Sequence, residues 1–138
     1  MLAPSGVTFA LDLAGPIDGV TRFAAEGGCG LTIGCIDYVR PGHTVTSVNP
    51  EMDELRDTLA RARKSGAIGL KILGGHFPLT PEATGRVMQV CADEGAYVAC
   101  HSGTINTPQN VDGMRESCEA ADGNPLHLAH RALTPWFA

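Results

Sequence analysis

The sequence predicts an α/β fold in which about five parallel strands alternate with helices. Short apolar segments recur along the 138 residues, and a segment with helical spacing of its apolar residues follows each of the first four. One helix between successive strands is the connection that parallel pairing requires. No change of composition, linker or sequence repeat divides the chain, so we expect one domain over residues 1–138.

The five expected strands are short apolar segments bounded by glycine, proline or polar residues. They are residues 6–13, 31–36, 67–73, 97–101 and 126–130. We expect the second strand to end at Asp37 and a loop to cover residues 38–48. The third contains a single charge, Lys71, in a run of Ile, Leu, Ala and Gly. Such a run is typical of a strand buried on both faces of a parallel sheet, where a charged side chain needs a partner or a function.

The four expected helices begin at capping sequences and end at or near glycine. Their starts lie after Pro16 and at Asn49-Pro50-Glu51, Thr80-Pro81 and Thr107-Pro108, and their ends lie near Gly27, Gly66, Gly95 and Gly123. In the first helix, Ile17, Val20 and Phe23 share one face, which we expect to be buried. The second helix has an acidic first turn and a basic last turn, as the helix dipole favours.

Composition and charge exclude several classes of function. The chain is 43% hydrophobic and 18% charged, as in ordinary globular proteins, and its net charge of −5 with no basic cluster argues against nucleic-acid or acidic-membrane binding. No apolar run approaches the ~20 residues of a membrane span, and the N-terminus lacks the basic region of a signal peptide. We therefore expect a cytoplasmic protein. The five cysteines form no C-x-x-C pair, which predicts reduced, mostly buried thiols.

The main functional signal is a regular spacing. Lys71, His101 and His130 follow one another at intervals of 30 and 29 residues, each about one βα unit, at or near the ends of three successive strands. Neighbouring parallel strands would therefore present them at one edge of the sheet. Imidazole is a common ligand of zinc and similar ions. An ammonium group would be repelled by a metal ion, so Lys71 fits such a site only if it is neutral or converted to an anion.

These segments resemble the metal-dependent amidohydrolase superfamily, in particular its dihydroorotase, dihydropyrimidinase and N-acyl-amino-acid deacylase branches. Residues 66–71 are similar to strand 4 of that family, residues 99–101 to strand 5 and residues 126–130 to strand 6. The resemblance implies an incomplete (β/α)8 TIM barrel. Strands 1, 7 and 8 would be missing, because neither the family's His-x-His pair nor its strand-8 aspartate has a counterpart in the chain. Residues 1–138 are thus expected to be a partial amidohydrolase barrel domain.

The resemblance also implies a mechanism. Carbon dioxide would convert Lys71 to a carbamate that bridges two divalent ions, zinc or similar, with His101 and His130 as further ligands. The reaction would be hydrolysis of a non-peptide C–N bond in a small-molecule amide or cyclic amide. The catalytic residue is unknown, because the strand-8 aspartate is absent, and we expect the chain alone to be inactive and aggregation-prone or molten.

Several histidines and aspartates have two interpretations. Residues three apart on a strand point to opposite faces, so His127 and His130 cannot both be ligands. His130 keeps the regular spacing, and His127 would then pack outward against a helix or bind backbone. His76, in the loop after residues 67–73, either contacts substrate or is a solvated loop residue. Asp12 and Asp37, at strand ends, either line the site or cap turns.

Two other functions remain open at this stage. Lys71 could instead be the Schiff-base nucleophile of an aldolase-type barrel, since a desolvated lysine is what that chemistry requires. That hypothesis leaves the spaced histidines unexplained. Alternatively, the chain is a non-catalytic truncated scaffold that pairs its open sheet edges with another chain.

Overall fold

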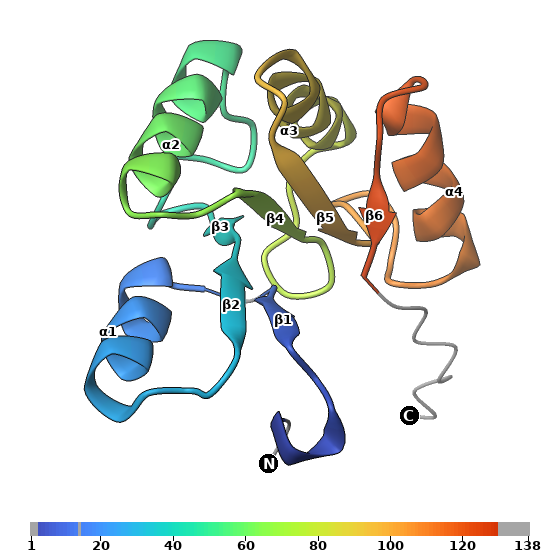
Figure 1. Cartoon of the computed structure of the whole chain (residues 1–138). Coiled ribbons are helices and arrows are strands. Elements are labelled where there is room, and N and C mark those ends of the chain that lie inside the picture. The colour runs from blue at the N-terminus through green and yellow to red at the C-terminus, as the bar shows by residue number, and fades with distance from the viewer. Residues whose placement is uncertain (1–2, 14, 130–138) are drawn as a thin grey trace.

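The computed structural model describes residues 3–13 and 15–129, in which parallel strands alternate with helices (Figure 1). The strands are β1 (Phe9–Asp12), β2 (Thr32–Cys35), β3 (Asp37–Val39), β4 (Gly69–Leu73), β5 (Tyr97–His101) and β6 (His127–Leu128). The helices are α1 (Ile17–Gly27), α2 (Met52–Lys64), α3 (Pro81–Asp93) and α4 (Val111–Ala121), and a 3-10 turn, Ala3–Ser5, precedes β1. All strand pairings are parallel. The predicted α/β class is confirmed, and closure into a barrel stays a prediction.

The predicted strand 31–36 is interrupted and serves two hydrogen-bonded groups of strands. β1 pairs with β2, and a second group has the order β3-β4-β5-β6. The break is at Ile36, whose N–H donates to the Asp12 carbonyl at 3.1 Å, while the Cys35 carbonyl accepts from the N–H of Ile68 at 2.9 Å. The expected strand end at Asp37 was therefore wrong. The chain changes its pairing partner at Ile36, from β1 to β4, and continues as a strand.

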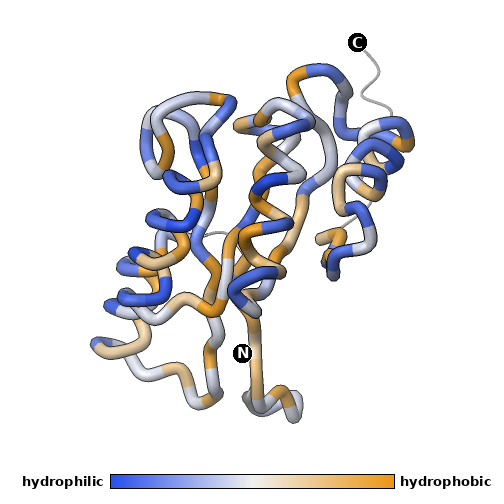
Figure 2. Tube along the Cα trace, turned by 90° about the horizontal axis from the view of Figure 1, so that it is seen from above, coloured by the Kyte–Doolittle hydropathy of each residue, from blue (hydrophilic) through white to orange (hydrophobic). Residues whose placement is uncertain are grey.

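Helices α2, α3 and α4 cover one face of the four-stranded group, and in Figure 1 all four helices lie around the outside of the strands. Figure 2 shows hydrophobic segments alternating with hydrophilic ones along the helices, as expected of helices with one buried face. The buried apolar side chains of this layer include Val39, Leu70, Ile72, Val98 and Cys100 from the strands and Leu55, Leu59, Val87 and Val90 from the helices. Burying one such Leu, Ile or Val contributes about 1.5–3 kcal/mol, so this layer holds the strands in place.

The face of the strands opposite the helices carries Lys71 and His127. Lys71 lies opposite Ala99 on β5, and Ala99 lies opposite His127 on β6. Residues in register on parallel strands share a face, so these three point away from the helices. Leu128 instead packs against the helix-covered core. The expectation that His127 packs outward against a helix was wrong, because its register with Ala99 places it on the other face. His130 lies outside the described residues.

The helix starts agree with the predicted capping residues only in part. Thr80 caps α3 as expected, accepting a hydrogen bond from the Ala83 N–H at 3.1 Å. The N-cap of α2 is Glu51, which makes no side-chain capping bond, and α4 is capped by Asn110 rather than by Thr107. The cap of α2 lies within the predicted Asn49-Pro50-Glu51 segment, whose Asn49 side chain bonds to α3 instead. The predicted start of α4 at Thr107 was wrong, and the Thr107 hydroxyl bonds to Glu116.

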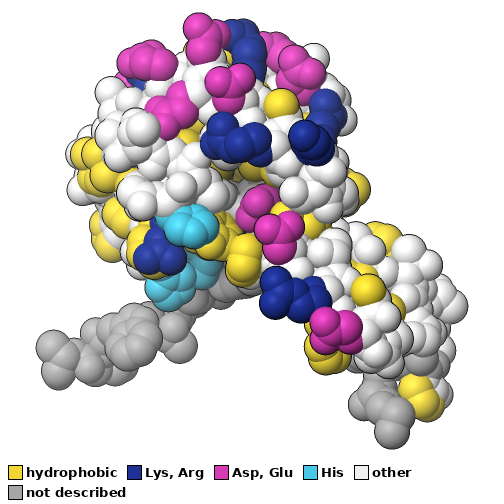
Figure 3. Space-filling model, turned by 90° about the vertical axis from the view of Figure 1, so that its left-hand side faces the viewer, with side chains coloured by type: hydrophobic (Ala, Val, Ile, Leu, Met, Phe, Trp, Pro, Cys, Tyr) yellow, Lys and Arg dark blue, Asp and Glu magenta, His cyan; other side chains and the backbone are white. Residues whose placement is uncertain are grey.

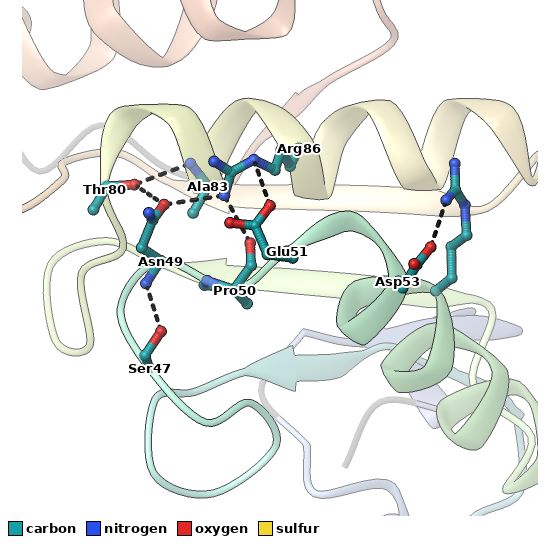
Figure 4. Close-up of polar contacts among 9 residues, drawn as sticks. Ser47, Asn49, Pro50, Glu51, Asp53, Thr80, Ala83 and Arg86 are labelled. Atoms are coloured by element: carbon teal, nitrogen blue, oxygen red, sulfur yellow. Dashed lines mark hydrogen bonds and ion pairs between the residues drawn. The ribbon is translucent and has the colours of Figure 1, made fainter.

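Asn49 joins the loop before α2 to the start of α3 (Figure 4). Its Oδ1 accepts from Thr80 Oγ1 at 2.8 Å and from Arg86 Nη1 at 3.0 Å. Arg86 Nη1 also donates to the Pro50 carbonyl at 2.8 Å, and its Nε lies 4.0 Å from Glu51 Oε2. These contacts fix the entry of α2 against α3.

Helix α1 is only partly buried against β1 and β2. Ile17 is 3% exposed and Val20 packs against the core, but Phe23 is 68% exposed. The predicted burial of Phe23 was therefore wrong. An open groove of about 450 Å³, lined by Leu11, Val20, Phe23 and Ile33 among others, lies between α1 and the two strands.

Two further predictions from the sequence concern the state of the cysteines and the presence of a membrane-spanning helix. All five cysteines are free, and Cys35, Cys91 and Cys100 are buried, which confirms reduced and mostly buried thiols. Within residues 3–13 and 15–129, no helix combines the length and apolar character needed to cross a membrane.

Candidate functional site

Lys71 lies in the middle of β4, which is paired on both sides. It is 3% exposed, and its neighbours Leu70 and Ile72 are fully buried on the helix side. Desolvation by burial lowers the pKa of Lys71 below its ordinary value, and the nearby Cys100 opposes this shift. At a given pH, a larger fraction of Lys71 therefore carries the neutral, nucleophilic amine than in a solvated lysine.

Glycine allows the ends of β4 and β5 to approach each other. The N–H of Gly74 donates to the His101 carbonyl at 3.0 Å. A Cβ at Gly74 would lie 2.4 Å from that carbonyl oxygen and 2.2 Å from the carbonyl oxygen of Gly103. Any other residue would force the two strand ends apart. The glycine after β4 thus brings the end of the Lys71 strand against His101.

A tight turn after β4 places His76 against His101. The N–H groups of His76 and Phe77 both donate to the Leu73 carbonyl, at 2.9 and 2.8 Å. The His76 ring meets that of His101 edge to face, with centroids 5.5 Å apart and an interplanar angle of 81°. His101 itself is 7% exposed. The structure therefore brings together two of the predicted site residues, the candidate ligand His101 and the candidate substrate contact His76.

Gln109, which the sequence did not single out, borders the same place. A Cβ on Gly75 would lie 2.3 Å from Gln109 Oε1 and 3.5 Å from His101 Nε2. The missing side chain of Gly75 leaves the space that the Gln109 carboxamide fills. The pair Gly74-Gly75 directly after a buried strand was the available signal, but it does not identify the residue that fills the space.

The β5–α4 loop that carries Gln109 is held by side-chain hydrogen bonds. The hydroxyls of Thr104 and Thr107 both donate to Glu116 Oε2, the first at 2.7 Å. The Ile105 N–H donates to the Leu79 carbonyl at 3.0 Å and joins this loop to the one after β4. The two loops therefore form one connected rim beside His101.

The segment after β3 carries a cation, Arg40, and a third histidine, His43. The guanidinium carbon of Arg40 lies 4.1 Å from the centre of the Phe77 ring. Tyr38 and His43 are joined by a hydrogen bond of 3.4 Å between the phenol oxygen and Nδ1. On the face seen in Figure 3, His side chains gather beside a Lys or Arg side chain and hydrophobic ones.

His127 is paired with a tyrosine on the face that carries Lys71. The Tyr97 hydroxyl and His127 Nδ1 are hydrogen bonded, and the two rings meet edge to face with centroids 5.7 Å apart. This phenol–imidazole pair satisfies one ring nitrogen of His127. Its observed contact is therefore with a tyrosine of the neighbouring strand.

Asp12 and Asp37 make short local contacts. Asp12 Oδ1 accepts from the Gly15 N–H at 3.0 Å, and Asp37 Oδ1 accepts from the Tyr38 N–H at 2.9 Å. Both carboxylates also act on Cys35, since burial first and then their charges raise the pKa of its thiol to about 11. Of the two interpretations for Asp12, turn capping is therefore the one with an observed contact.

The described residues fit part of a metal site. Burial lowers the pKa of Lys71, which is the direction that a site using its neutral amine requires, and His76 and His101 offer imidazoles in contact. Within the described ranges, however, no three His, Cys, Asp or Glu side chains are grouped closely enough to hold a metal ion. The proposed ligand set therefore depends on the converted Lys71 and on His130, which lies outside those ranges.

Comparison with known proteins gives a likeness of fold. No family model matches the chain, and no curated protein does. Among solved structures, it is similar to the crystal structure of a "putative prolidase from Bifidobacterium longum", with a TM-score of 0.50 and 21% sequence identity. The similarity covers 84% of this chain and 31% of the other, so the chain spans about a third of that protein. At this identity the likeness concerns the fold alone.

Proposed function

We propose that this chain is part of a metal-dependent hydrolase, built on a (β/α)8 barrel, that cleaves non-peptide C–N bonds in small amides or cyclic amides. The observation that carries the proposal is Lys71, 3% exposed in the middle of a parallel strand, facing away from the helices. His101 ends the neighbouring strand, two residues beyond the position opposite Lys71. The likeness in fold to a protein described as a prolidase agrees with a hydrolase.

In this proposal Lys71 reacts with carbon dioxide. The neutral amine attacks the carbon of CO2, a C–N bond forms, and the nitrogen loses a proton, which leaves an anionic carbamate. Burial favours the neutral amine that this step needs, because desolvation penalises the ammonium. The carbamate, His101 and His130 would then hold two divalent ions, which supply a water of near-neutral pKa and polarise the substrate carbonyl.

The other residues of the site have positioning roles in this proposal. Gly74 holds the end of β4 against the His101 carbonyl and so orients the His101 strand end. His76 lies at the ring of His101 and would contact the substrate there. Neither role requires His76 or Gly74 to react.

The proposal is tested by detecting the carbamate directly. The chain has two lysines, Lys64 at the exposed end of α2 and Lys71, which gives a matched pair. With 13C-labelled bicarbonate, we expect a carbamate carbon resonance that disappears in Lys71→Arg and remains in Lys64→Arg. Metal analysis of the same samples should detect a bound divalent ion only where the resonance is present. A spectrum unchanged by Lys71→Arg would refute the proposal.

The same observation favours a second function, because a desolvated amine is also what a Schiff-base enzyme requires. The amine would attack a carbonyl substrate and lose water to form an imine, which borohydride reduces to a stable amine. Incubation with small ketones and borohydride, followed by peptide mass analysis, distinguishes the two. Mass added at Lys71 without a carbamate resonance would support the Schiff-base enzyme in place of the hydrolase. The absence of both the added mass and the resonance would support a non-catalytic scaffold.

A further inference from the structure

We infer that Arg40 and Phe77 form a binding subsite for a carboxylate at the rim beside His101. The guanidinium carbon of Arg40 lies 4.1 Å from the centre of the Phe77 ring. A guanidinium held against an aromatic face keeps its N–H donors at its edge, in the plane where a carboxylate binds with two parallel hydrogen bonds. The stacking also reduces the freedom that the side chain would lose on binding.

The backbone around Arg40 is fixed without help from its side chain. Its carbonyl accepts from the N–H groups of His43, Thr44 and Val45 at 3.2, 3.0 and 3.2 Å, and its own N–H donates to Thr44 Oγ1 at 2.7 Å. The guanidinium is therefore not needed to close this turn. A change of the Arg40 side chain should leave the loop in place.

Arg40 differs from the arginines that are paired within the chain. Arg56, Arg63 and Arg86 form ion pairs with Asp53, Glu94 and Glu51. Across residues 3–13 and 15–129, no carboxylate forms an ion pair with Arg40. Arg22, Arg61 and Arg115 also form no ion pair within the described residues, so what distinguishes Arg40 is its position over the Phe77 ring. In a chain of net charge −5, a guanidinium held in this way without an acidic partner is suited to an anionic ligand.

One turn connects this subsite to the candidate site. Phe77 and His76 are consecutive, and both N–H groups bind the Leu73 carbonyl. The turn therefore presents Phe77 under Arg40 and His76 against His101. The identity of the substrate rests on the proposed hydrolase function. With that function, the substrate is an amide that also bears a carboxylate, as an N-acylated amino acid does.

The test compares two probes that differ only in the carboxylate, N-acetylglycine and N-acetylglycinamide, by calorimetric titration of the full chain. We expect the acid to bind about tenfold tighter, because a bidentate guanidinium–carboxylate pair adds a charge-assisted interaction. Arg40→Gln should abolish this preference, and Phe77→Leu should reduce it. Arg40→Lys should keep part of it, since lysine retains the charge but not the planar fork. Arg56→Gln, at an exposed position of α2, is the matched control and should bind as the unaltered chain does.

Two outcomes would overturn the inference. One is that the unaltered chain binds both probes equally or binds neither, and the other is that Arg40→Gln binds the acid as tightly as before. Thermal unfolding of each variant shows whether it is folded, and the comparison of the two probes on the unaltered chain stands without any variant. Binding needs neither metal nor turnover, so a carboxylate preference without a carbamate resonance would refute the hydrolase proposal and keep the subsite.

Discussion

Lys71 lowers the stability of the fold at neutral pH, because its charge must be removed or desolvated. Its pKa in the folded chain is below the ordinary value of 10.5. Between the lowered pKa and 10.5, the unfolded chain binds more protons than the folded one, so the free energy of unfolding rises with pH. The cost of this residue is therefore greatest at low pH and disappears as pH approaches 10.5.

We expect Lys71→Met to unfold at a higher urea concentration than the unaltered chain at pH 7, and the difference to change only toward narrowing as the pH is raised to 9. Methionine keeps an apolar chain of similar length and removes the amine. Urea titrations at both pH values check this. The series stops at pH 9 because burial raises the pKa of Cys91 and Cys100 to about 11, which adds a separate dependence above that pH. Lys64→Met is the control, and a difference that widened with pH would contradict the expected sign.

At the scale of residues, the sequence predicted the part of the site that follows from strand pattern. A single charge in an apolar run was enough to predict a buried Lys71, and the βα spacing placed His101 on the next strand. Arg40 and Gln109 could not be predicted, because their positions depend on how two loops meet. The orientation of His127 was also missed, since the face of a two-residue strand is set by its register with β5.

At the scale of elements, the Asn49 contacts are expected to stabilise the pairing of α2 with α3. Asn49→Ala removes an acceptor shared by Thr80 and Arg86, and we expect a loss of about 1 kcal/mol in the free energy of unfolding. Arg56→Ala, which removes an exposed ion pair within α2, is the control and should change stability little. Urea unfolding of both variants measures this. Equal effects would mean that the Asn49 contacts do not stabilise the fold.

Substitution of Gly69 tests the close approach of β4 and β5, and substitution of Gly19 is its control. A Cβ at Gly69 would lie 1.7 Å from the Tyr97 carbonyl oxygen, so Gly69→Ala must separate the strands, at a cost of about 3 kcal/mol. Gly19, within α1, has no heavy atom within 4 Å of its Cβ position. Gly19→Ala should therefore stabilise the chain by about 0.5–1 kcal/mol through helix propensity. Thermal unfolding of the two variants should shift in opposite directions.

Whether the sequence predicted an element depended on the range of the interactions that define it. Helices α2 and α3 follow from apolar spacing and, for α3, from the Thr80-Pro81 cap, which are local signals. The break at Ile36 depends on an exchange of partners between β1 and β4, strands more than fifty residues apart in sequence. The side chain of Asn49 was likewise directed to another helix by residues that lie far along the chain.

At the scale of the whole molecule, the β1–α1–β2 part carries exposed aromatic side chains. Phe23 is 68% exposed and lines the open groove of about 450 Å³, and Phe9 on β1 is 54% exposed. We expect Phe23→Gln to reduce self-association with little change in the free energy of unfolding, because little apolar burial is lost. Light scattering over a concentration series and urea unfolding check the two parts. Unchanged scattering would mean that association uses another surface.

Every strand pairing joins strands that follow one another along the chain, and this has a consequence for synthesis. β1 pairs with β2, β3 with β4, β4 with β5 and β5 with β6. β2, β4, β5 and β6 each therefore find a partner already made when they leave the ribosome, and β1 and β3 wait only for the next strand of the chain. Such pairings also keep the sequence separation of contacts short, which favours fast folding. The chain can thus assemble one βα unit at a time, from its N-terminal end onward.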